Sequence, residues 1–430
     1  MTAPRPKKKL TLFDLICIGV NAIVGSGIYA FPGQLTQLLG SASFLAFAAC
    51  GVMSLIVGLC FAEAASGTTR SGGPYVYARE AFGSNIGYAV GFSCWVAALL
   101  SWAAVANALV PYLGHLLPAL AKGWSGTTAV VTLTLLLGAI NYFGVKPGAY
   151  ITDFLTLAKL VPLVMLTVAG FIGYDSALVA QTTPFDWSAL PQAAFLAFFA
   201  YQGFEVVPVP AGESNNPRRN APLAVIGSVV GATLLYIAVQ IAAVGSTPDL
   251  AGSKEPLALM GAAVLGALGS KIVAAAAVVS MLGFCAGVAL TGPRYVEALA
   301  LDGFLPSWVS RRHARYDTPG GAIIFTTAIT AVLIAVLDFR RLVDLAVFIV
   351  ALQYVSTAVA VLVRRYRRGA DGDGWQMPGG PAIPLLSIVV VLVFVGWPAA
   401  KSADIRHLIA LGVLIGLGLL PALWKRFGEA

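Results

Sequence analysis

Charged residues are scarce in this sequence. Asp, Glu, Lys and Arg together make up 11% of the 430 residues, whereas 58% are hydrophobic. No soluble domain needs so much apolar surface, and a single membrane span needs about 20 apolar residues. The composition therefore excludes an ordinary soluble protein and predicts an all-α integral membrane protein with about twelve transmembrane helices.

The usual signs of metal, redox and hydrolytic chemistry are also missing. The five cysteines fall inside apolar stretches and form no CxxC pair, so we expect small buried side chains rather than disulfides or a metal site. The three histidines lie at or beyond the predicted span ends, far apart in the sequence. We expect no metal, no cofactor and no enzyme active site, because a membrane-embedded enzyme needs such residues to converge inside the spans.

The apolar stretches divide the chain into twelve predicted spans. No cleavable signal peptide is expected, because the first apolar stretch is long and lacks a small-residue cleavage site. The net charge of +8 does not indicate a nucleic acid partner, since the basic residues lie in short loops between spans. The predicted spans are 12–38, 42–66, 82–112, 126–144, 151–173, 191–211, 222–245, 268–292, 320–337, 343–363, 382–399 and 405–424.

The basic residues predict the orientation of these spans. If the N-terminus is cytoplasmic, nineteen of the 27 Lys and Arg residues fall on the cytoplasmic side, seven fall outside and Lys159 lies within a span. This asymmetry follows the positive-inside rule, so we expect a multi-pass plasma-membrane protein with both termini in the cytoplasm. Contact with anionic lipid headgroups is an alternative role for the arginines at the span ends.

The first span contains a predicted break within residues 14–33, DLICIGVNAIVGSGIYAFPG. Gly25 and Gly27 flank Ser26, and each glycine costs about 1 kcal/mol in a helix relative to alanine. In hydrocarbon, a break is tolerated only where protein or a water-filled cavity receives the freed backbone groups. The half-helix that begins near Ser26 would point N–H groups and a positive dipole end at an anion, most simply a carboxylate. The alternative is that the small residues only let two helices pack closely.

A second interrupted span covers residues 193–213. Gly203 and three further glycine or proline residues disturb its apolar run, and Glu205 places an ionisable group where insertion costs a few kcal/mol. The two broken spans are the first and the sixth, so each begins a block of five spans. Because five is odd, the two blocks cross the membrane in opposite directions. Broken first helices in two inverted repeats indicate a central binding site in a secondary transporter. The predicted divisions are a tail at 1–11, a first repeat at 12–173, a second, inverted repeat at 191–363 and two helices outside the repeat at 382–424.

Several stretches in a fixed order carry a family signature. The first two are 19–29 (GVNAIVGSGIY) and 71–75 (SGGPY). The third is 198–205 (FFAYQGFE), followed by 211–213 (AGE) and 216–219 (NPRR). The fourth begins at Arg294, continues through 302–306 (DGFLP) and ends at Thr318-Pro319. They resemble the amino acid–polyamine–organocation (APC) superfamily, and the resemblance covers roughly residues 12–363. It implies a bacterial amino acid permease with a five-plus-five inverted repeat, a leucine-transporter-like fold with broken helices 1 and 6.

The resemblance also implies that the substrate binds between the two broken spans. Backbone N–H groups at Ser26 and Gly27, with the Ser26 hydroxyl, would receive the carboxylate of an amino acid, next to Gly25. The α-ammonium would lie at the other break, beside Gly203, where carbonyl-rich helix ends suit a cation. The carbonyl groups implied for it are those of Ala22, Ile23, Phe199, Ala200 and Gln202.

Two ionisable residues are candidates for coupling or gating. By resemblance, Glu205 would change its partner or its protonation as the carrier switches state; the alternative is a carboxylate permanently paired within the bundle. Lys159 in the fifth span resembles a tethered substitute for the sodium ion of related carriers, and it would tie the first span to the fifth and eighth. The alternative is a lysine that snorkels to the inner interface.

The substrate side chain would meet a pocket of aromatic and apolar residues. Because Glu205 is the only acidic residue predicted deep in the spans near the site, a neutral, apolar or aromatic amino acid is favoured over a cationic one. Ordinary packing is the alternative for each pocket candidate. These candidates are Cys94, Trp95, Leu99 and Trp102 in the third span and Phe198, Tyr201 and Phe204 in the sixth.

These features together predict a secondary active transporter of neutral L-amino acids that works by alternating access. Its transport would be coupled to protons or to exchange of another amino acid. The alternative within carriers is a cationic amino acid or polyamine substrate. A channel is less favoured, because no polar ring or selectivity loop is visible. The expected partners are a small amino acid and the lipid bilayer, and not nucleic acid.

Overall fold

Long apolar helices make up most of the described chain. The computed structural model describes residues 10–68, 73–120, 124–143, 149–209, 214–316, 318–368 and 374–402. Seven helical stretches in these ranges are long and apolar enough to cross a membrane, and three shorter helices are also apolar. The predicted span at 405–424 and most of the predicted tail at 1–11 lie outside the described residues.

Fifteen α-helices and four short 3-10 helices follow one another along the described ranges. The bounds are α1 Leu12–Ile23, α2 Gly27–Ala30, α3 Pro32–Leu39, η1 Gly40–Ser43, α4 Phe44–Ser66, α5 Pro74–Phe82, α6 Ser84–Leu116, η2 Pro118–Leu120, α7 Ser125–Tyr142, α8 Ala149–Ile172, α9 Ser176–Ala180, η3 Trp187–Ala189, α10 Leu190–Tyr201, η4 Phe204–Val206, α11 Pro217–Ser246, α12 Pro256–Leu301, α13 Gly320–Val336, α14 Phe339–Arg368 and α15 Ala382–Ser402.

Local sequence explains several of these helix starts. Thr11 and Asp14 form a capping box at the start of α1, since the Thr11 N–H donates to the Asp14 carboxylate at 2.7 Å and the Asp14 N–H donates to Thr11 Oγ1 at 3.3 Å. Helices α5, α11 and α12 each begin at a proline, which needs no hydrogen-bond acceptor in the first turn. The start of α1 agrees with the predicted span, whereas α11 and α12 begin five and twelve residues before the predicted spans.

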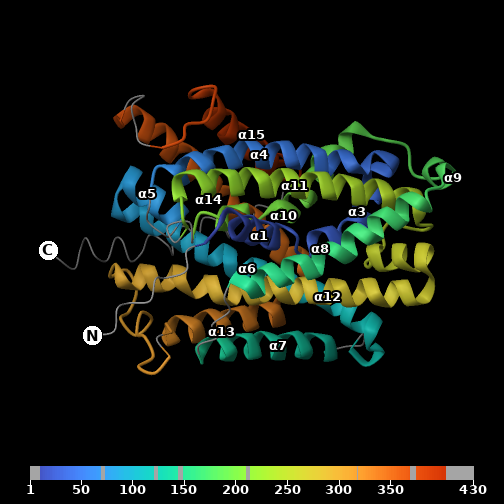
Figure 1. The fold of residues 1–430 in the computed structure, drawn as a ribbon, viewed down its shortest axis with the longest axis horizontal. Helices are drawn as coiled ribbons and strands as arrows, with labels where there is room; N and C mark the ends of the chain where they lie inside the picture. The colour runs from blue at the N-terminus through green and yellow to red at the C-terminus, as the bar shows by residue number, and fades with distance from the viewer. Residues whose placement is uncertain are drawn as a thin grey trace.

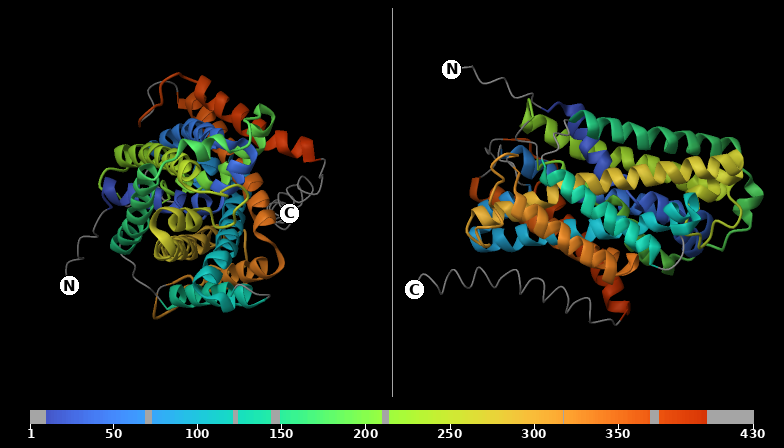
Figure 2. Two further views of the ribbon diagram at one scale, coloured as in Figure 1. Left: turned by 90° about the vertical axis from the view of Figure 1, so that its right-hand side faces the viewer. Right: turned by 90° about the horizontal axis from the view of Figure 1, so that it is seen from below.

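The helices run along the long axis of the molecule, with α1 and α10 in the middle of the bundle (Figure 1). Helix α11 packs on both α4 and α1, and α12 packs on α6 and α8. Helix α13 packs beside α7, and the two lie at the lower edge of the bundle in Figure 1 and in the left view of Figure 2. The two central, interrupted helices are thus surrounded by long continuous ones.

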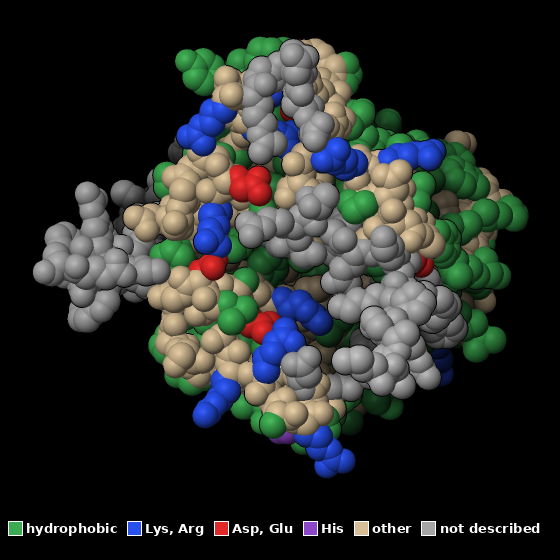
Figure 3. All heavy atoms as spheres, turned by 60° about the vertical axis from the view of Figure 1, so that its left-hand side comes forward, with side chains coloured by type: hydrophobic (Ala, Val, Ile, Leu, Met, Phe, Trp, Pro, Cys, Tyr) green, Lys and Arg blue, Asp and Glu red, His purple; other side chains and the backbone are tan. Residues whose placement is uncertain are grey.

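One end of the bundle, which we call the charged end, gathers charged side chains between the helix ends (Figure 3). The Arg79 guanidinium at the C-terminal end of α5 pairs with Asp302, which follows α12. Thr318 Oγ1, just before α13, donates to the carbonyl oxygen of Tyr142 at the end of α7 at 2.8 Å. All four residues lie in or beside loops that the charge pattern assigns to one side of the membrane.

Glu63 joins three segments at the charged end. Its side chain is fully buried, and its carboxylate accepts hydrogen bonds from Arg365 Nε at 2.7 Å and from the backbone N–H of Met377 at 2.9 Å. Arg364 Nη2 donates to the Glu63 carbonyl oxygen at 2.8 Å. The C-terminal end of α4 is thereby fixed to α14 and to the segment that precedes α15.

The eighth span is longer than its apolar pattern indicates. The sequence predicts 268–292, whereas α12 extends over Pro256–Leu301 and contains a non-helical residue at Gly266. Gly266 has φ 72°, a conformation that residues with a Cβ rarely adopt. The first turn of α12 is attached to the bundle by Glu255, which precedes the helix and pairs with His115 at the end of α6.

We predict that Glu63→Gln destabilises the protein by roughly 3 kcal/mol, because it leaves the guanidinium of Arg365, whose side chain is 17% exposed, without its buried carboxylate partner. Thermal unfolding of the purified protein in detergent measures this loss. Asp338→Asn is the matched control, since the Asp338–Arg341 pair is 62% and 69% exposed and should contribute little. Equal unfolding temperatures for the two variants would contradict the structural role of Glu63.

Candidate functional site

The first break lies where the sequence predicts it. Helix α1 ends at Ile23, residues 24–26 are not helical, and the helix resumes at Gly27. The Tyr29 N–H donates to the Ser26 carbonyl oxygen at 3.1 Å, so the N–H groups that precede it lie ahead of the first intrahelical bond of α2. Ser26 Oγ is buried and has no hydrogen-bond partner among the described residues. This break therefore offers polar groups that a ligand can bind.

The second break follows α10. Helix α10 ends at Tyr201, Gln202 is extended with φ −62° and ψ 140°, and Gly203 has φ 130°. That φ value favours glycine, so Gly203 is required for the chain to leave the helix in this direction. Both polar atoms of the Gln202 side chain are buried and lack partners within the described part of the chain. The Phe199 carbonyl oxygen already accepts a bond from the Gln202 N–H at 3.3 Å.

The two breaks are in direct contact. A Cβ atom on Gly27 would lie 2.3 Å from Ala200 Cβ, and one on Gly203 would lie 2.6 Å from the Ala22 carbonyl oxygen. Both distances are too short for any side chain, so these glycines allow the backbones to approach. Gly25 has more room, since its nearest neighbour would be a ring carbon of Phe284 at 3.4 Å. The predicted binding residues of both spans thus come together.

Lys159 on α8 joins the fifth span to the first at the first break. Its side chain is 0% exposed, and Nζ donates to the carbonyl oxygens of Asn21 at 3.0 Å and Val24 at 2.9 Å. Ser280 Oγ on α12 donates to the same Val24 oxygen at 3.4 Å. The ammonium group therefore satisfies carbonyl groups that the end of α1 leaves free, and it does not snorkel to an interface.

Glu205 accepts two hydrogen bonds just after the second break. The Gly203 N–H donates to Glu205 Oε2 at 2.8 Å, and the Tyr354 hydroxyl on α14 donates to the same oxygen at 3.0 Å. The side chain is buried, and no Lys or Arg of the described residues forms an ion pair with it. Neutral donors therefore hold this carboxyl group, and a change in its protonation would change these bonds.

The predicted pocket residues of the sixth span pack close to Glu205. The rings of Phe198 and Phe204 lie 5.7 Å and 5.1 Å from the ring of Tyr354. The Tyr201 hydroxyl donates to the Phe47 carbonyl oxygen on α4 at 2.7 Å. These side chains form an aromatic cluster beside the second break.

The third-span candidates have three different surroundings. Trp102 and Leu99 are buried in the main core, and Trp102 Nε1 has no partner among the residues described. Trp95 instead stacks on Phe325 at 5.2 Å and donates to Thr326 Oγ1 at 3.1 Å, so its ring is directed at α13. Cys94 belongs to a small separate cluster near α5. A pocket role for these residues stays a prediction.

Tyr236 on α11 is a further candidate site residue, which the sequence alone did not indicate. Its hydroxyl lies 2.9 Å from the Ile23 carbonyl oxygen and 3.0 Å from that of Ala200, so one side chain touches both breaks. The signal was a phenol in the middle of an apolar span, because a buried tyrosine hydroxyl usually finds a hydrogen-bond partner. Its partners could not be read from the sequence, since they lie 213 and 36 residues away.

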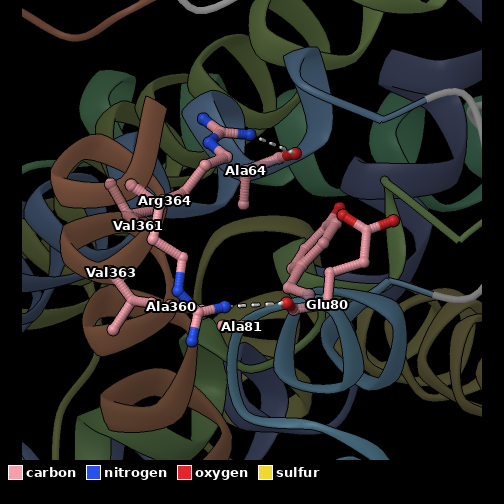
Figure 4. A pocket seen from close by; sticks show the side chains of 9 residues that line it. Ala64, Glu80, Ala81, Ala360, Val361, Val363 and Arg364 are labelled. Carbon is pink, nitrogen blue, oxygen red and sulfur yellow. Dashed lines mark hydrogen bonds between the residues drawn. The ribbon is translucent and has the colours of Figure 1, made fainter. Parts of the chain in front are cut away.

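A cavity of about 190 Å³ lies at the charged end, away from the breaks. Figure 4 shows it between α4, α5 and α14, with Arg364 directed at the Ala64 carbonyl oxygen, 3.3 Å away. Arg367 reaches across to the carbonyl oxygen of Glu80 at 3.5 Å. None of the predicted binding residues lines this cavity.

Two interrupted spans that meet inside an all-α membrane bundle define the architecture of a secondary transporter. The sequence profile described as amino acid permease matches residues 10–419. The chain therefore belongs to the amino acid permease family of the APC superfamily. This assignment confirms the predictions of a membrane transporter of amino acids rather than an enzyme.

Curated relatives span nearly the whole chain. The serine/threonine exchanger SteT of Bacillus subtilis (strain 168) is 28% identical over 425 residues, which cover 96% of each chain. The branched-chain amino acid permease BcaP of the same organism is 26% identical over 436 residues, covering 96% of this chain and 92% of its own. The vacuolar cationic amino acid transporter 4 of Arabidopsis thaliana is 27% identical over 386 residues, covering 84% of this chain and 63% of its own.

We predict that Gly27→Ala separates the two breaks, because its new methyl group would overlap Ala200. The expected loss of stability is about 1–3 kcal/mol, as for other overpacked sites, and substrate binding should fall with it. Gly231→Ala on α11 is the control, since a Cβ there meets nothing within 4 Å. Unfolding temperature and substrate affinity in detergent are the measurements, and an unchanged Gly27→Ala protein would show that the close contact is not required.

Proposed function

We propose that this permease moves neutral L-amino acids across the plasma membrane by alternating access, with both of its termini in the cytoplasm. The observation that supports this most is the meeting of the two breaks, where the N–H start of α2 and the carbonyl ends of α1 and α10 converge. The carboxylate of a zwitterionic amino acid matches the N–H start of α2, and its ammonium group matches the carbonyl ends of α1 and α10. Residues 12–173 and 191–363 are proposed as the two inverted repeats, since α1 begins at the charged end and α10 at the opposite one.

The proposed carboxylate site is the start of α2. The N–H groups of Ser26 and Gly27 precede the first intrahelical bond there, and Ser26 Oγ is buried with no partner among the described residues. Backbone N–H groups at a helix start, together with the helix dipole, favour a negative group. A carboxylate between them would satisfy polar atoms that the protein itself leaves unpaired.

The proposed ammonium site is formed by carbonyl oxygens at the ends of α1 and α10. Among these, Ile23 and Ala200 present oxygens that already converge on one hydroxyl group. An ammonium group carries three donors and is well matched to several carbonyl oxygens. Ala22 and Gln202 flank these positions in the two breaks.

The aromatic lining supports a neutral substrate. Phe198 and Phe204 pack with Tyr354 beside the second break, and the Glu205 carboxylate already accepts two hydrogen bonds. The two Bacillus subtilis relatives carry names that refer to serine, threonine and branched-chain amino acids, which are all neutral. A cationic substrate is the second candidate, because Glu205 forms no ion pair among the described residues and one relative is named for cationic amino acids.

For coupling, we propose that Lys159 occupies the place of a bound sodium ion and that Glu205 carries the transported proton or gates exchange. Lys159 Nζ supplies a fixed positive charge to the carbonyl end of α1. Glu205 is held only by uncharged donors, so protonation of its carboxyl group would not break an ion pair. Such a group can take up and release a proton without leaving a buried cation unpaired.

The test of the substrate is an uptake screen of the common amino acids in liposomes that contain the purified protein. Neutral amino acids should be taken up saturably, and either an inward proton gradient or an internal neutral amino acid should stimulate the uptake. Protein-free liposomes serve as the control. Uptake of lysine or arginine alone would instead establish the cationic alternative.

We predict that Glu205→Gln removes the stimulation by a proton gradient while exchange continues, because the amide keeps the shape of the side chain but does not titrate. Glu80→Gln at the charged end is the control and should retain the full stimulation. The measurement is the ratio of uptake with and without the gradient. An unchanged ratio in Glu205→Gln would remove this residue from proton coupling.

A further inference from the structure

The cavity at the charged end has room for one small polar group. Its volume is about 190 Å³, which is less than the roughly 300–1,000 Å³ of pockets for drug-sized ligands. Its charged lining residues are Arg364, Arg367 and Glu80 (Figure 4). When Glu63 and its partner Arg365 are counted with them, three positive charges stand against two negative ones. The excess of positive charge favours an anionic group.

Tyr77 on α5 also lines this cavity. The residue is 6% exposed, and its hydroxyl forms no hydrogen bond within the described part of the chain. Burial raises the pKa of Tyr77, so the hydroxyl keeps its proton and is a neutral donor. A buried tyrosine hydroxyl usually has a hydrogen-bond partner. The cavity is the adjoining space from which such a partner can come.

Arg367 supplies a positive charge at the same cavity. Its Nη1 donates to the Glu80 carbonyl oxygen at 3.5 Å, and it forms no ion pair among the residues that the structure describes. A guanidinium has five N–H donors in a planar fork, which suits the oxygen atoms of a phosphate. Arg364 Nη2 donates to the Glu63 carbonyl oxygen at 2.8 Å, so a second guanidinium is held in place at the cavity.

The cavity lies at the level expected for lipid headgroups. The apolar run of α14 ends at Val363, and residues 364–368, which follow, are RRYRR. Tyr366 is 92% exposed, and tyrosines are enriched where spans meet the membrane–water interface. Ala360, Val361 and Val363 give the cavity an apolar wall beside its arginines. A free phosphate ion gains nothing from that wall, whereas the glycerol and acyl parts of a phospholipid bury apolar surface against it.

We propose that this cavity binds the phosphate group of an anionic membrane phospholipid. The phosphate oxygens accept hydrogen bonds from Arg367 and Tyr77, and the charge of Arg364 favours the same group. The bound lipid joins α5 to the end of α14. This site is separate from the two breaks, and it does not depend on which amino acid the protein carries. Because Tyr354 on α14 donates to Glu205, the lipid would restrain a helix that contacts the candidate substrate site.

The test titrates dioleoylphosphatidylglycerol into the full-length protein in detergent and follows the unfolding temperature, which rises when a ligand binds the folded state. Tyr77→Phe is the first variant, because it removes the hydroxyl and keeps the ring. Its apparent Kd for the lipid should rise about threefold or more. Its unfolding temperature without lipid should equal that of the wild type, since the hydroxyl has no partner to lose among the described residues.

Arg367→Gln is the second variant, and it decides the question alone if Tyr77→Phe is unstable. It removes a charge-assisted hydrogen bond, so the apparent Kd should rise about tenfold. The matched controls are Tyr88→Phe and Arg311→Gln. Tyr88 is a buried tyrosine whose ring stacks on Phe304 at 4.5 Å, Arg311 is exposed in the loop after α12, and neither lines the cavity. Both controls should bind the lipid as the wild type does.

Two further ligands decide the source of the phosphate. Inorganic phosphate should leave the wild-type unfolding temperature unchanged. Dioleoylphosphatidylcholine, whose net charge is zero, should bind about fivefold more weakly than the anionic lipid. If inorganic phosphate stabilises the wild type but not Arg367→Gln, and the lipid does neither, the lipid assignment is wrong and the cavity is a phosphate-ion site. Equal affinity for the two lipids would overturn the proposal, as would an unchanged Kd in Arg367→Gln or an equal loss of affinity in Arg311→Gln.

Discussion

The structure depends on one constraint, which is that every backbone group freed inside a membrane helix needs a partner. At the first break, Lys159 satisfies the Asn21 and Val24 carbonyl oxygens, and at the second, the Glu205 side chain accepts the Gly203 N–H. Tyr236 then serves both breaks. The groups that stabilise the interruptions therefore come largely from the continuous helices around them. The polar atoms at the breaks that still lack a partner among the described residues form the candidate site.

The same constraint explains why glycine lies at the contact between the breaks. Side chains would keep the two backbones several ångströms apart, whereas Gly27 and Gly203 let Ala200 and Ala22 approach closely. Carbonyl oxygens from two helices can then converge on one point. Small residues at these positions allow the two helices to pack closely. The close packing in turn determines where the backbone carbonyl oxygens of the candidate site lie.

Local patterns in the sequence were sufficient for the parts of the fold that depend on local physics. The breaks at Gly25-Ser26-Gly27 and Gly203 follow from residues that are poor in helices, and the alternation of the spans follows from the basic loops. The contacts of Tyr236, the direction of the Trp95 ring and the kink at Gly266 depend on which helices become neighbours. One sequence does not contain that information, so the cross-helix part of the candidate site was found only in the structure.

Helix α14 gives the candidate site a direct connection to the charged end. Tyr354 on this helix donates to Glu205, and Arg365 on the same helix pairs with the buried Glu63. The two residues are eleven positions apart, which is about 16 Å along a helix that rises 1.5 Å per residue. A rigid shift of α14 would change both contacts together. Under the proposed coupling, a change of partner at Glu205 would alter what α14 is bonded to near the breaks, and the same helix would carry that change to the Glu63–Arg365 contact at the charged end.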